Sequence, residues 1–155
     1  MRKIFLLLTH SAMLVAGFAL GVYLLPILTA PPSPDADQLQ AMAIGAIYQT
    51  EFTRDLPGSD FLHWGEGTVS VTPTQIVHDG KLSPGPDYKL YLVPEFVDHE
   101  DAFLPLKGQS LLVGDVKTFD GVIVDLPAGV DLDAYTTILI WCEAFSEFIT
   151  AAKYR

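Results

Sequence analysis

The sequence predicts a mainly β protein, an antiparallel β-sandwich preceded by one N-terminal transmembrane helix. An uncharged apolar run covers residues 4–28 and is long enough to cross a bilayer. Beyond it, seven short apolar or alternating segments are separated by Gly, Pro and Asp, a pattern typical of antiparallel sandwiches and barrels. We therefore expect an anchor at 1–28, a proline-rich linker with a short helix at 29–47, and a β domain at 48–155.

The anchor begins with two basic residues, Arg2 and Lys3, ahead of the run from Ile4 to Leu28. As a helix this run would span about 37 Å, against about 30 Å of hydrocarbon. The basic residues favour a cytoplasmic N-terminus, with the β domain on the opposite side of the membrane. A cleaved secretory signal is the alternative, but its apolar region usually has about 7–15 residues. We expect a retained single-pass anchor.

Two glycines within the anchor, Gly17 and Gly21, form a Gly-x-x-x-Gly pair. Such a pair allows two membrane helices to approach closely. Glycine is also common in single membrane helices, so a homodimer through this pair is one interpretation and an isolated helix is the other.

The linker is followed by the predicted secondary structure of the domain. Residues 29–38 form a proline-rich, extended spacer, and Asp35 or Asp37 could cap a helix over 38–47. The predicted strands, taken from alternation and from apolar runs between turn residues, are 48–54, 68–72, 88–93, 111–116, 121–126, 136–142 and 147–154.

The charge and cysteine content exclude several classes. After residue 30 the chain has nineteen Asp and Glu against seven Lys and Arg, a difference of −12. Such an acidic surface repels phosphate backbones, so nucleic acid is not an expected partner. Cys142 is the single cysteine, which excludes an internal disulfide and the usual zinc, dithiol and c-type haem signatures.

A set of residues recurs along the β domain in a recognisable order: Gly67, Gly85, Pro86, Asp87, Pro127, Tyr135, Trp141 and Cys142. Together they resemble the DM-thirteen domain family, in its small, membrane-anchored bacterial form. The resemblance implies a β-sandwich with a role in electron transfer, Cys142 as the redox-active group, and an unidentified redox or binding partner in the bacterial envelope. It places the anchor in the inner (cytoplasmic) membrane, with the domain facing the periplasm or the outside of the cell. Glu143 departs from the family, in which a basic residue is common at this position.

Cys142 has two interpretations that the residues leave open. On a strand, Cys142 shares one face with Ile140, while Trp141 and Glu143 share the other. A free cysteine among isoleucines is commonly a small buried hydrophobe, whereas a redox cysteine needs a partly exposed thiolate. The first hypothesis is an electron-transfer domain centred on Cys142 with Trp141 beside it. The second is a non-catalytic envelope interaction module in which both are core residues.

No catalytic or metal site is predicted, and no cofactor is assigned. The chain has no Gly-x-Ser-x-Gly and no phosphate-binding loop, so an exported enzyme is the least favoured class. Residues 98–101 could hold a hard cation, although a solvated loop is the simpler interpretation, and Asp87 is expected to bond backbone amides in its turn. A blue-copper centre needs two His, one Cys and usually Met, and the spacing does not fit for the available residues, which are His63, His78, His99, Met42 and Cys142.

Overall fold

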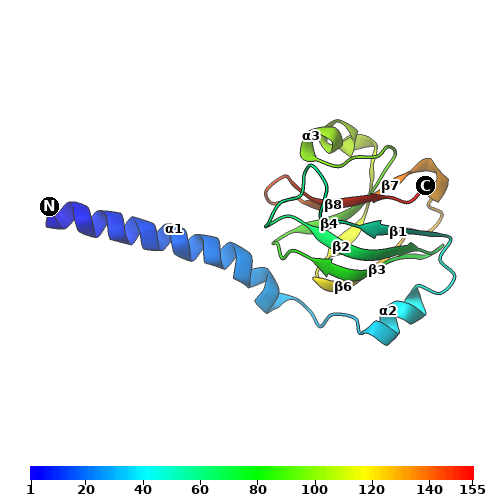
Figure 1. Cartoon of the computed structure of the whole chain (residues 1–155), viewed down its shortest axis with the longest axis horizontal. Helices are drawn as coiled ribbons and strands as arrows, with labels where there is room; N and C mark the ends of the chain where they lie inside the picture. The colour runs from blue at the N-terminus through cyan, green and yellow to red at the C-terminus, as the bar shows by residue number, and fades with distance from the viewer.

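The computed structural model describes all 155 residues and consists of a long helix followed by a two-layer β-sandwich (Figure 1). The helices are α1 (Arg2–Thr29), α2 (Ala36–Met42) and α3 (Glu100–Phe103), with short 3-10 segments η1 (Leu104–Gln109) and η2 (Leu132–Ala134). The strands are β1 (Tyr48–Phe52), β2 (Gly65–Val71), β3 (Gln75–Leu82), β4 (Tyr88–Val93), β5 (Leu111–Val116), β6 (Asp120–Asp125), β7 (Thr137–Cys142) and β8 (Glu147–Lys153).

The strands form two four-stranded sheets, in the orders β1-β2-β3-β6 and β5-β4-β7-β8, and every pairing is antiparallel. The predicted fold class, an antiparallel β-sandwich after one apolar helix, is therefore confirmed. The sequence predicted seven or so strands; the structure has eight, and the one that was missed is β3. Its register shifts between His78 and Lys81, where a His-Asp-Gly-Lys sequence interrupts the alternation that marks a strand.

Two other local predictions need correction. Asp35 caps α2 by accepting a hydrogen bond from the Gln38 backbone N–H at 2.8 Å, but α2 ends at Met42 instead of residue 47. The segment from Glu100 to Gln109, for which no helix was predicted, forms α3 and η1. It lies over the outer face of the second sheet, at the top of Figure 1.

β7 is buried along its whole length and contributes to two apolar cores. Ile140 and Cys142 belong to the core between the sheets, whereas Leu139 and Trp141 belong to a smaller core beneath α3. The predicted alternation of side chains between the two faces of β7 is confirmed. A strand covered on both faces can be apolar throughout, which explains its continuous run of hydrophobic residues.

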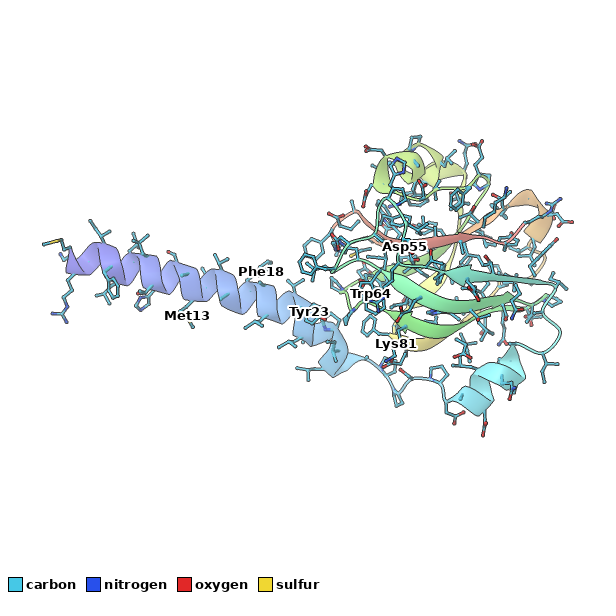
Figure 2. The ribbon with its side chains drawn as sticks, viewed as in Figure 1. Met13, Phe18, Tyr23, Asp55, Trp64 and Lys81 are labelled. Atoms are coloured by element: carbon cyan, nitrogen blue, oxygen red, sulfur yellow. The ribbon has the colours of Figure 1, made fainter.

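Helix α1 is long and apolar enough to cross a membrane, a test that an N-terminal signal sequence also passes. None of its residues is buried, and its side chains, such as that of Met13, project on all sides (Figure 2). An exposed apolar surface of this size is typical of a segment that contacts a membrane or another protein.

Gly67 is required by the close approach of β2 and β3. Its φ is +118°, and an added Cβ would lie 2.4 Å from the backbone oxygen of Asp79. Gly67→Ala should therefore lower the free energy of unfolding by about 1–3 kcal/mol, measured by thermal unfolding of the full chain in detergent. Gly108→Ala is the matched control, because no atom lies within 4 Å of its added Cβ. Equal stability of the two variants would contradict the packing described for Gly67.

His78 supplies a pH test of the core between the sheets. Its Nε2 lies 3.0 Å from the Glu66 carbonyl oxygen, its buried Nδ1 has no partner, and burial lowers its pKa. As pH falls below about 6.5 the unfolded chain binds the proton first, so stability should decrease by up to about 1.4 kcal/mol per pH unit. Unfolding midpoints at pH 7 and pH 5 measure this loss, and His78→Gln should reduce it. If the stability of that variant depends on pH as in the wild-type chain, groups other than His78 cause the loss of stability.

Candidate functional site

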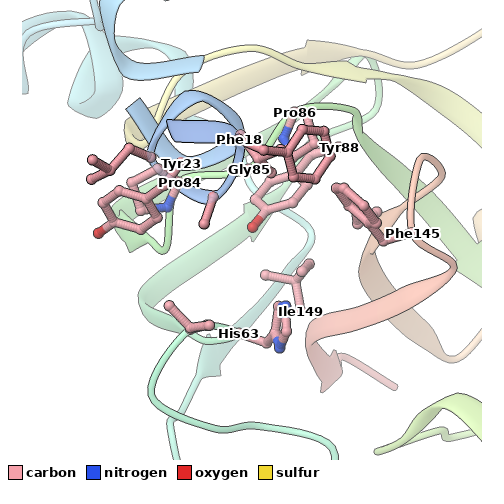
Figure 3. Close-up of a pocket in the computed structure, with 14 residues that line it drawn as sticks. Phe18, Tyr23, His63, Pro84, Gly85, Pro86, Tyr88, Phe145 and Ile149 are labelled. Atoms are coloured by element: carbon pink, nitrogen blue, oxygen red, sulfur yellow. The ribbon is translucent and has the colours of Figure 1, made fainter. Parts of the chain in front are cut away.

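Cys142 ends β7 at the end of the sandwich nearest to α1. It pairs with Tyr88, the first residue of β4, which follows the turn formed by Gly85, Pro86 and Asp87. A groove of about 490 Å³ separates this end from α1 and is lined mainly by apolar side chains, with Cys142 in its wall. Figure 3 shows the groove with Tyr88 and Phe145 among its labelled lining residues.

The sulfur of Cys142 is protected from water but lies among backbone amides. The residue is only 3% exposed. Burial raises the pKa of the thiol, and the backbone N–H groups of Phe145, Asp87 and Ala144 act in the opposite direction. The thiol is therefore protonated at neutral pH, in a position where several amides can stabilise negative charge that develops on the sulfur.

The turn before β4 holds this end of the sandwich together. A Cβ on Gly85 would lie 2.3 Å from the Tyr88 ring, so glycine allows the ring to fold back under the turn. The Asp87 carbonyl accepts a hydrogen bond from the Glu143 backbone N–H at 2.9 Å. The Asp87 carboxylate lies 2.7 Å from Lys89 Nζ, whereas the sequence predicted bonds from this side chain to backbone amides.

Trp141 faces away from Cys142 and does not share its groove. It is completely buried beneath α3, with its ring centroid 4.9 Å from that of Phe103. Its indole N–H has no hydrogen-bond partner, and Lys107 Nζ lies 5.5 Å from the ring centroid. Because neighbouring side chains of a strand point to opposite faces, the Trp-Cys pair supplies one residue to each core.

A polar cluster at Glu143 was missed by sequence reasoning. Glu143 accepts a hydrogen bond from the Tyr91 hydroxyl and another from Lys107 Nζ at 2.6 Å. Lys107 is 36 residues away in sequence and reaches Glu143 only because η1 lies on this sheet. The acidic residue after Cys142 is thus neutralised by a lysine that the local sequence does not reveal.

The remaining motif residues lie outside the groove. Gly67 lies in β2 against β3, Pro127 follows β6, and Tyr135 precedes β7 and packs partly buried against the inner core. These three residues contribute to the packing of the sandwich.

The structure separates the three histidines of the domain. His63 lines the groove with Cys142, His78 lies in the core, and His99 Nδ1 lies 2.6 Å from Asp98. No three His, Cys, Asp or Glu side chains converge to hold a metal ion. In the acidic cluster at 98–101, Asp98 and His99 precede α3 in a loop, whereas Glu100 and Asp101 form the first turn of α3. Glu100 accepts a hydrogen bond from the Phe148 backbone N–H.

Comparison with known proteins identifies the class to which this sandwich belongs. Residues 51–154, about two thirds of the chain, match the family described as "Electron transfer DM13". The chain therefore belongs to the DM13 family of electron-transfer domains. No curated protein and no solved structure gives a significant match.

Alkylation of Cys142 tests the geometry of the groove. The buried, protonated thiol should react with a maleimide much more slowly in the folded chain than in the unfolded chain at pH 7. Its rate should continue to increase above the usual thiol pKa of about 8.5, because burial raises the pKa of the folded thiol. Mass spectrometry at a series of pH values measures both effects. Equal rates in the folded and unfolded chains would contradict the burial of the sulfur.

Proposed function

We propose that this chain is a single-pass protein of the bacterial cytoplasmic membrane that carries its electron-transfer domain on the periplasmic side, with Cys142 as the redox-active group. Under this proposal the chain comprises an anchor at 1–28, a linker at 29–47 and a redox domain at 48–155. The class of function follows from membership of the DM13 family. The centre on Cys142 and the placement outside the cytoplasm are specific to the proposal.

The anchor and its orientation are supported by charge. Arg2 and Lys3 lie in the first turn of α1, which has no other charged residue, and basic residues are retained on the cytoplasmic side of a membrane. The same helix carries Gly17 and Gly21, neither of which would meet an atom within 4 Å if given a Cβ. A homodimer in which two copies of α1 pack together at Gly17 and Gly21 remains a prediction.

The environment of the sulfur carries the redox assignment. Cys142 lies in the wall of a groove that opens to the surface, and the backbone N–H groups of Phe145, Asp87 and Ala144 partly offset the effect of burial on the pKa of its thiol. Because the thiol is protonated, loss of one electron is coupled to breakage of the S–H bond. The proton passes to solvent water at the groove, and the thiol becomes a thiyl radical. The electron passes to a redox group on an envelope partner, and the reverse step restores the thiol.

A second function is favoured by the burial of Cys142. At 3% exposure, packed in the inner core, the residue also fits a structural role in a non-catalytic envelope interaction module. In that case the acidic surface of the domain recognises the partner, and Cys142→Ala lowers stability by about 1 kcal/mol without any other effect.

Voltammetry of the full chain in a supported bilayer separates the two functions. The redox proposal predicts a one-electron couple that is lost in Cys142→Ser and retained in Ser110→Ala, a matched control outside the groove. The potential should fall by about 59 mV per pH unit, because one proton leaves with each electron. This slope should persist to high pH, since the thiol pKa is raised.

Absence of any couple in the wild-type chain, together with a small loss of stability in Cys142→Ala, would favour the interaction module. A couple that survives in Cys142→Ser would contradict the assignment of the redox centre to this residue.

A further inference from the structure

Three large apolar side chains are exposed in the two segments that bring Leu62 and Phe145 to the groove beside α1. Phe61 is 85% exposed, Leu62 is 42% exposed and Phe145 is 50% exposed. Phe61 and Leu62 lie in the connection between β1 and β2, and Phe145 lies in the turn between β7 and β8. We call these three side chains the apolar rim. They belong to two different segments of the chain, and none of them is part of either apolar core.

The apolar rim is continuous with the transmembrane helix. Leu62 and Phe145 line the same groove as Phe18, Val22 and Tyr23 of α1. Figure 3 shows Phe18 close to the turn before β4, with Phe145 among the other residues that line the groove. In Figure 2, Phe18 and Tyr23 lie toward the end of α1 that approaches the domain.

The length of α1 locates this contact relative to the bilayer. If the hydrocarbon begins at Ile4, after the basic residues, about twenty helical residues bring its outer boundary to Tyr23. Tyrosine is enriched at such boundaries. Phe18 lies five residues earlier, about 8 Å deeper along the helix axis. The groove therefore lies at the height of the outer boundary, within the depth of about 5–10 Å that interfacial side chains reach.

Charge does not oppose insertion of the apolar rim, although the domain is acidic as a whole. Asp60, next to the rim, accepts hydrogen bonds from two backbone amides at 2.7 Å. Glu143 is paired with Lys107, and Asp87 is paired with Lys89. Carboxylates that are already paired lose less solvation on approaching a lipid surface than free ones. The attraction is apolar and does not need anionic headgroups.

We propose that the apolar rim inserts into the outer surface of the bilayer that α1 spans, and that its partner is the phospholipid itself. This inference rests on the anchor of the proposed function and is independent of the role of Cys142. Insertion holds the Cys142 end of the sandwich against the membrane. The groove then opens at the lipid surface, where a redox partner confined to the same membrane can reach it.

Quenching of tryptophan fluorescence by brominated lipids tests the insertion. The full chain is reconstituted in phosphatidylcholine vesicles, in a Trp64→Phe background where only buried Trp141 remains. Phe145→Trp should lose emission with bromine placed near the headgroups and lose less with bromine at the bilayer centre. Ile47→Trp is the matched control, since Ile47 is 53% exposed and precedes β1 at the opposite end of the sandwich, beside Val71.

Leu14→Trp, in the middle of α1, reports on the anchor separately and should be quenched by bromine at the bilayer centre. Quenching of Leu14→Trp with none of Phe145→Trp would overturn the insertion while leaving the anchor intact. Equal quenching of Phe145→Trp and Ile47→Trp would also overturn it, because contact would not be specific to the rim. Loss of quenching in Leu14→Trp would remove the anchor itself, and the insertion with it.

Discussion

The arrangement of this domain depends on β7, a strand whose two faces are both buried. β7 pairs with β4 on one side and β8 on the other, and it contributes to the core between the sheets and to the core beneath α3. Successive side chains along a strand point to opposite faces of the sheet. The adjacent residues Trp141 and Cys142 are therefore divided between two environments, one closed under a helix and the other beside an open groove.

This division determines how the Trp-Cys pair can act. Trp141 is surrounded by aromatic rings such as Phe103, and Lys107 lies over its ring. Cys142 instead lies against the turn before β4, with its sulfur among backbone amides. The indole thus packs beneath α3, on the opposite face of β7 from the Cys142 side chain, and does not line the groove.

The sequence predicted those parts of the fold that depend on local pattern. The apolar run of α1, the Asp35 cap and the alternation of β7 are properties of neighbouring residues, and each was found. β3 was missed because a bulge at His78 breaks its period. The ion pair between Lys107 and Glu143 was missed because it joins residues that only tertiary structure brings together. The groove could not be predicted for the same reason, since α1 and the turn of residues 143–146 line it from opposite ends of the chain.

Under the proposed function, oxidation leaves an unpaired electron on the sulfur of Cys142, and the single cysteine of the chain makes a direct measurement practical. Paramagnetic resonance of the oxidised, rapidly frozen full chain would be compared between protein made with ordinary cysteine and protein made with β-deuterated cysteine. If the account is correct, deuteration narrows the hyperfine pattern, because the unpaired electron couples to the Cys142 β-protons. A spectrum that ignores cysteine deuteration and changes with labelled tryptophan or tyrosine would contradict it.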